Sequence, residues 1–108
     1  MTRITVYKNE WNEYVGFRAD GHADYAEAGE DIVCAAISIL TLNTVNAIET
    51  FTEDAFVADS DEELGYLAFQ LLQRPKKEAA LLLKTMVLGL EDIAKNYENY
   101  IDFTFEEV

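Results

Sequence analysis

The apolar residues of this chain follow two different periods, and the order of those periods limits the folds open to it. A period of two, typical of half-buried strands, marks five segments: residues 2–7, 12–20, 54–58, 64–71 and 100–108. Helical spacing marks residues 31–50 and a second segment that starts at Pro75 and reaches Tyr97. The predicted order is β-β-α-β-β-α-β. This order favours an α/β fold of the α+β type, a largely antiparallel sheet with two helices packed on it.

Chain length and net charge limit the number of domains and the classes of function open to this protein. The 108 residues suit one domain, predicted to span residues 1–108 without a linker. Acidic residues outnumber basic ones by 21 to 8, for a net charge of -13. This balance argues against direct nucleic-acid binding, which needs clustered Lys and Arg. It favours encounter with a basic partner, although a self-repelling surface would show the same charge.

The cellular setting is predicted from what the sequence lacks. No N-terminal segment has the pattern of a signal peptide, and no apolar run of roughly 18–20 residues that could cross a membrane stands out. A single cysteine cannot form an internal disulfide, which fits a reducing cytoplasm. One Cys and one His also cannot supply the four ligands of a structural zinc site. We therefore expect a cytoplasmic protein with no metal, no cofactor and no membrane partner.

The only histidine and the only cysteine stand twelve positions apart in residues 21–38, "GHADYAEAGEDIVCAAIS". Both have an ordinary structural explanation, since free cysteine is often buried and "IVCAAISIL" suits a core helix. A catalytic explanation is also open. If Asp31 caps the helix, Cys34 lies in its first turn, where the helix dipole and free N–H groups favour a thiolate and could hold an oxyanion. His22 could then fold back as the general base.

Four neighbours of this pair are candidate supporting residues, each with two interpretations. Asp31 is either a plain helix cap or also a carboxylate that orients His22. Ser38 lies one turn after Cys34 and either contacts the site or bonds back to the helix. Gly21 and Gly29 bracket a loop and serve either as hinges of a flap or as residues of tight turns. The aromatic residues Tyr25, Phe56 and Tyr66 could line a cleft, but core packing explains the last two equally well.

Taken together, these residues resemble the signature of the ribosomal-processing cysteine protease family, Prp. The pattern is Gly-His-Ala, a short loop with Gly-x-Asp, an apolar pair, Cys, small residues and Ser. It is matched without departure at seven positions: Gly21, His22, Ala23, Gly29, Asp31, Cys34 and Ser38. Length, element order and acidic balance also fit, so the resemblance spans essentially the whole chain.

The resemblance implies a bacterial homodimer that removes a short N-terminal extension from a basic large-subunit ribosomal protein, number twenty-seven. It assigns the nucleophile to Cys34 and the general base to His22. Two rival hypotheses remain at this stage. One is a non-enzymatic acidic protein that binds a basic ribosomal protein or assembly factor, and the other is a cysteine acyltransferase or amidase that uses the same pair.

Overall fold

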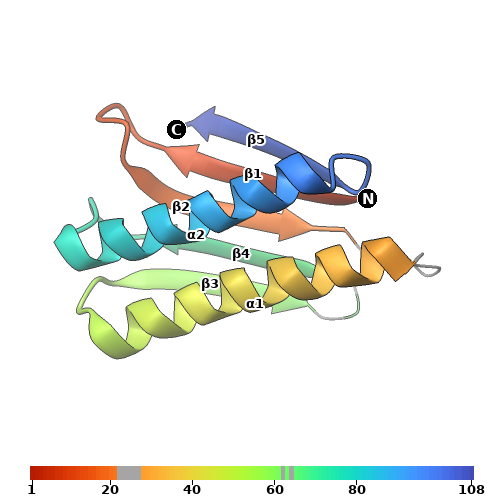
Figure 1. The fold of residues 1–108 in the computed structure, drawn as a ribbon. Coiled ribbons are helices and arrows are strands. Elements are labelled where there is room, and N and C mark those ends of the chain that lie inside the picture. Colours follow the sequence, from red (N-terminus) through yellow and green to blue (C-terminus); the bar gives the residue numbers. More distant parts are fainter. Residues whose placement is uncertain (22–27, 62, 64) are drawn as a thin grey trace.

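The two helices lie side by side across one face of a five-stranded sheet (Figure 1). The computed structural model describes residues 1–21, 28–61, 63 and 65–108. The strands are β1 (Thr2–Lys8), β2 (Tyr14–Asp20), β3 (Phe56–Asp61), β4 (Tyr66–Leu71) and β5 (Ile101–Glu107), and the helices are α1 (Ala28–Phe51) and α2 (Lys77–Asn96). Their order is the predicted β-β-α-β-β-α-β.

The sheet is mixed but mostly antiparallel, as the sequence predicted. Its strand order is β3-β4-β2-β1-β5. The pairs β1–β2, β2–β4 and β3–β4 are antiparallel, whereas β5 runs parallel to β1. Because α2 crosses from β4 to β5, it carries the chain over the sheet to the far edge (Figure 1). The α+β fold is therefore confirmed.

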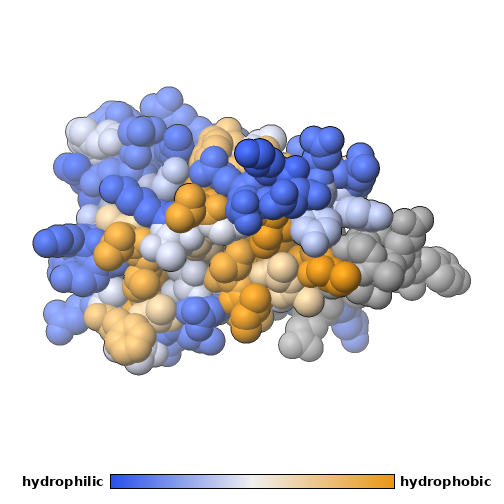
Figure 2. Space-filling model, viewed as in Figure 1, coloured by the Kyte–Doolittle hydropathy of each residue, from blue (hydrophilic) through white to orange (hydrophobic). Residues whose placement is uncertain are grey.

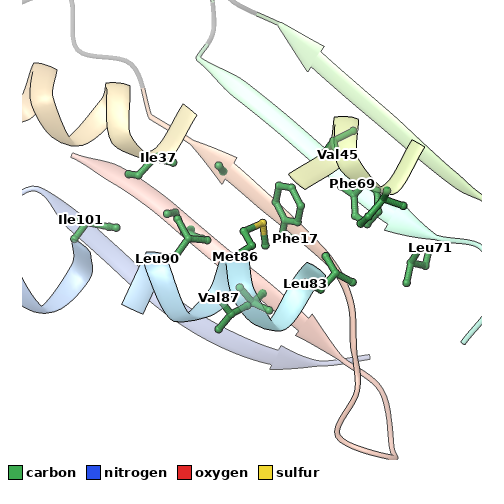
Figure 3. Close-up of a cluster of buried hydrophobic side chains, with 14 of the residues drawn as sticks. Phe17, Ile37, Val45, Phe69, Leu71, Leu83, Met86, Val87, Leu90 and Ile101 are labelled. Carbon is green, nitrogen blue, oxygen red and sulfur yellow. The ribbon is translucent and has the colours of Figure 1, made fainter. Parts of the chain in front are cut away.

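The core fills the space between the sheet and both helices (Figure 3). In β2 the alternating residues Val15, Phe17 and Ala19 face the helices and are buried, as their spacing predicted. The Phe17 ring stacks on Phe69 of β4, with ring centroids 5.4 Å apart. The helices supply Val33, Ile37, Val45 and Ile48 from α1 and Leu83, Met86, Val87 and Leu90 from α2.

Several element boundaries differ from the sequence-based predictions. Helix α1 begins at Ala28 rather than at residue 31, and α2 begins at Lys77, so Pro75 precedes the helix. Strand β3 runs to Asp61, beyond the predicted segment 54–58. Strand β3 lies at the edge of the sheet and is largely exposed, so its residues can be polar. They pair with β4, but the sequence shows no apolar alternation that would have identified them as a strand.

Helix α1 also corrects an expectation about membranes. By length and composition alone its segment Ile32–Phe51 could cross a bilayer, so a sufficiently apolar run does exist. Helices of ordinary protein cores pass the same test, however. In this fold one side of α1 packs on the sheet through buried residues such as Ile37 and Ile48, whereas Ile39 and Leu42 of the same helix are exposed.

A polar cluster ties the β1–β2 turn to the segment before α2, at the other end of the sheet from Cys34. Arg74 donates to Glu13 over 2.9 Å and stacks on the Trp11 ring, with its guanidinium carbon 3.9 Å from the centroid. Asn9 donates a second hydrogen bond to the same carboxylate. These two donors, Arg74 first, hold the pKa of Glu13 below its ordinary value.

Candidate active site

A hollow of about 390 Å³ opens at the end of the sheet where α1 begins. Each of the first four strands contributes to it at that end: Thr2 from the start of β1, Ala19 from β2, Ser60 and Asp61 from the end of β3, and Tyr66 and Leu67 from β4. Helix α1 forms the facing wall with Cys34, Ile37, Ser38, Thr41 and Leu42. In Figure 1 this end lies on the right, beside the label of the N-terminus. The hollow thus brings together segments far apart in the sequence.

Cys34 faces this hollow, and its side chain is only half-buried. Its sulfur lies 3.4 Å from the Thr2 hydroxyl oxygen, a distance suitable for a hydrogen bond to sulfur. A cysteine buried solely for packing would not open onto a cavity. The position is therefore suited to a nucleophile that must meet a substrate.

The relation of Cys34 to the helix start differs from the prediction. Because α1 begins at Ala28, Asp31 lies inside the helix and is not its N-cap, and Cys34 is the seventh residue. Only the first four N–H groups of a helix lack an intrahelical partner, and the dipole effect fades beyond the first turn. The expectation that the Cys34 amide is a free oxyanion donor in the first turn is therefore wrong.

Ser38 shares the hollow with Cys34, one helical turn further along. The predicted common face is thus confirmed. Its side chain is exposed, and its backbone carbonyl accepts a 3.3 Å hydrogen bond from the Thr41 hydroxyl. The Ser38 hydroxyl is therefore placed to meet whatever occupies the hollow.

The two predicted hinge glycines have different surroundings. Gly21 follows β2 and lines the hollow with a positive φ of 141°. A Cβ there would lie 2.5 Å from the Met1 carbonyl oxygen and 2.6 Å from the Thr2 Cα. Close backbone approach thus explains why glycine stands at this position. Gly29 lies within α1 and not in the preceding loop, which is a correction to its predicted place.

His22 lies outside the described residues, as do Ala23 and Tyr25. It is bonded directly to Gly21, which lines the hollow that also contains Cys34. Its role as the base stays a prediction.

Sequence reasoning did not assign several residues that line this hollow. Thr2 and Asp61 are among them, and no local motif marked either of these two. Of the candidate aromatic residues, Tyr66 lines the hollow, whereas Phe56 packs against Phe69 with ring centroids 5.0 Å apart. The order β3-β4-β2 brings Tyr66 near α1, and only the sheet topology could have revealed this.

The rim of the hollow is acidic. Asp61 lines it, and an adjoining hollow contains Asp20 and Asp59 as well. Arg18 offsets part of this charge by donating to Asp20 over 2.9 Å, and that hydrogen bond raises the pKa of Arg18 above its ordinary value. The guanidinium of Arg18 also lies 4.7 Å from the centre of the Tyr66 ring. Among the described residues, this side of the opening carries the carboxylates of Asp20, Asp59 and Asp61 beside the guanidinium of Arg18.

Comparison with known proteins gives this geometry a context. Residues 1–102 match the model of the family "Cysteine protease Prp". The chain belongs to this family. A curated relative, the ribosomal processing cysteine protease Prp of Staphylococcus aureus, is 30% identical over 106 residues, which cover 98% of this chain and all of the relative. The Bacillus subtilis Prp is 28% identical over 108 residues, covering 96% of each chain.

Solved structures of Prp proteins share the fold. The S. aureus protease in complex with a substrate peptide superposes with a TM-score of 0.91 at 29% identity, covering 98% of this chain and all of that one. The same protease with a covalently linked product peptide gives a TM-score of 0.88 at 30% identity, with the same coverage. Membership of the Prp family, predicted from the signature around Cys34, is therefore confirmed.

Proposed function

We propose that this Prp family member removes the N-terminal extension of a basic large-subunit ribosomal protein, number twenty-seven, and so prepares it for ribosome assembly. The observation that carries the proposal is that the half-buried residue Cys34 lines a hollow of about 390 Å³. The S. aureus relative has been solved with a substrate peptide and with a covalently linked product peptide, which supports covalent catalysis at a cysteine in this family.

In the proposed mechanism His22 removes the proton of the Cys34 thiol, and the sulfur attacks the scissile carbonyl carbon. The tetrahedral intermediate collapses as the C–N bond breaks, and the imidazolium of His22 protonates the departing amine, the new N-terminus of the ribosomal protein. The extension remains bound to sulfur as a thioester. Water, deprotonated by His22, then hydrolyses the thioester and frees Cys34. Supporting roles for Ser38 and Asp31 remain predictions.

The charge of the protein suits such a substrate. The chain carries a net charge of -13, and Asp61 with the neighbouring Asp20 and Asp59 lies beside the hollow. Opposite charge accelerates the encounter of two macromolecules, and this effect weakens as ionic strength rises. We infer that a basic precursor protein meets the enzyme in the cytoplasm, where a lone thiol stays reduced.

A mass-spectrometric assay tests the proposed function directly. The extended ribosomal protein is incubated with the purified enzyme and the masses of all products are measured. We expect a single N-terminal cut. It should release the extension with a free carboxylate and the ribosomal protein with a free N-terminal amine. A stable complex without any cut would instead support an acidic binding protein, and transfer of the extension to an added amine without hydrolysis would support an acyltransferase.

We further propose that the protein is a homodimer that pairs through the outer helix face, defined as Ile32, Ile39 and Leu42 of α1 with Leu81 and Leu88 of α2. All five side chains are exposed. Figure 2 shows hydrophobic surface gathered over the two helices, on the side turned away from the sheet. Monomeric proteins rarely expose a large contiguous apolar patch, and a second copy would cover this one with a patch of the same kind. Since Leu42 also lines the hollow, the partner would lie close to the site.

The oligomeric state of a matched pair of variants tests this interface. Leu88 is 72% exposed on the outer helix face, whereas Leu72 is 59% exposed outside both helices. We expect Leu88→Glu to shift the protein from dimer to monomer in sedimentation velocity, because it places a charge in the apolar contact. Leu72→Glu should leave the dimer intact. If Leu88→Glu stays dimeric, the interface lies elsewhere.

A further inference from the structure

We propose that Thr2 is a positioning residue for Cys34 and that its hydroxyl donates a hydrogen bond to the sulfur. The proposal rests on the proposed function in one respect, the role of Cys34 as nucleophile. It concerns a residue outside the signature, 32 positions before the cysteine in the sequence. The observation is the 3.4 Å contact between the Thr2 Oγ1 and the Cys34 Sγ at the edge of the hollow.

The fold fixes Thr2 firmly. It is the first residue of β1, its side chain is β-branched, and it is only 5% exposed. Its backbone N–H donates to the Tyr100 carbonyl over 3.0 Å, and its Cα pairs with Ile101 across the β1–β5 ladder. A hydroxyl held in this way has little freedom to turn elsewhere. It can therefore hold the sulfur in one orientation.

Thr2 also lies beside the backbone of Gly21. Gly21, the residue bonded to His22, lies so close to the start of β1 that any side chain on it would collide with Met1 and Thr2. The Gly21 N–H in turn donates to the Gly65 carbonyl over 3.1 Å. Thr2 therefore contacts both the backbone of Gly21 and the sulfur of Cys34. A shift of Thr2 would disturb both contacts.

The direction of the hydrogen bond depends on the protonation state of the sulfur. A neutral thiol and a hydroxyl can each donate to the other. A thiolate has no proton, so only the Thr2 hydroxyl can donate once Cys34 is ionised, and a hydrogen bond to a charged acceptor is stronger than one to a neutral acceptor. The contact can therefore still orient the sulfur in its reactive form. It weakens again when the sulfur is acylated and loses its charge.

Alkylation by iodoacetamide tests the proposal without any substrate. Cys34 is the only cysteine, so each alkylated molecule carries one adduct at a known place. We expect Thr2→Val to slow alkylation at neutral pH by about three- to tenfold, the effect of losing one ordinary hydrogen bond. Thr2→Ser, which keeps the hydroxyl, should restore the rate.

The matched control is Thr44→Val, the same substitution in α1 at a buried threonine outside the hollow, whose hydroxyl donates to the Leu40 carbonyl over 2.7 Å. Its alkylation rate should equal that of the wild type. Should Thr2→Val fold poorly, a comparison of Thr2→Ser, which keeps the hydroxyl, with Thr2→Ala, which lacks it, serves the same purpose. Equal alkylation rates with and without that hydroxyl overturn the proposal. Because no substrate takes part, this outcome is independent of whether the ribosomal protein is cleaved.

Discussion

Cys34→Ala is expected to abolish cleavage of the extended ribosomal protein, with a fall in kcat of at least about a thousandfold, because loss of a catalytic nucleophile removes the covalent route altogether. The fold should survive. The side chain is half-buried beside the hollow, so its loss opens no sealed cavity in the core. Product masses measured over hours, alongside thermal unfolding, check both parts.

Two further variants show whether the loss of cleavage comes from the missing nucleophile or from a disturbed structure. Cys34→Ser keeps the size of the side chain and a partner for Thr2, yet it should be nearly as inactive because a hydroxyl is a far weaker nucleophile. His22→Ala should stop cleavage and also slow alkylation of Cys34, since it removes the base. Retained cleavage by pure Cys34→Ala would remove this residue from the mechanism.

The sheet and the core could be predicted because their signal is local. The alternation of Val15, Phe17 and Ala19 predicts one buried strand face, and all three are buried. Boundaries were less certain. Gly29 disfavours a helix and Asp31 is a good N-cap, so the sequence predicted a start at residue 31, yet α1 begins at Ala28. Local residue preferences therefore predicted the existence of this helix correctly but placed its first residue three positions too late.

The site could be predicted where it follows helical spacing, and not where it depends on the sheet. Cys34 and Ser38 are four residues apart on one helix, so their common face is evident from the sequence. Thr2, Asp61 and Tyr66 reach the same hollow because β1, β3 and β4 have particular places in the strand order. Pairing between distant segments decides those places, and no pattern within one segment encodes them.

Gly21→Ala is expected to lower the free energy of unfolding by about 2–4 kcal/mol, combining backbone strain with overpacking. At a φ of 141° a side chain is strained, and the added Cβ would lie 2.5 Å from the Met1 carbonyl oxygen. Because the colliding atoms belong to the backbone of Met1 and Thr2, they cannot rotate away as a side chain could. The start of β1 would have to move, and Thr2 with it, so alkylation of Cys34 should slow as well.

Gly89→Ala is the matched control, because its added Cβ would meet only the end of the flexible Leu40 side chain, 3.0 Å from its Cδ1. Alanine is also favoured over glycine within a helix by about 1 kcal/mol, so this variant should be as stable as the wild type or slightly more stable. Urea unfolding of both variants, with alkylation rates measured in parallel, separates the two sites. If Gly21→Ala matched the wild type in both stability and alkylation rate, the close packing of Gly21 against Met1 and Thr2 would not explain why glycine stands there. The alternative interpretation of Gly21 as the hinge of a flap would then be favoured.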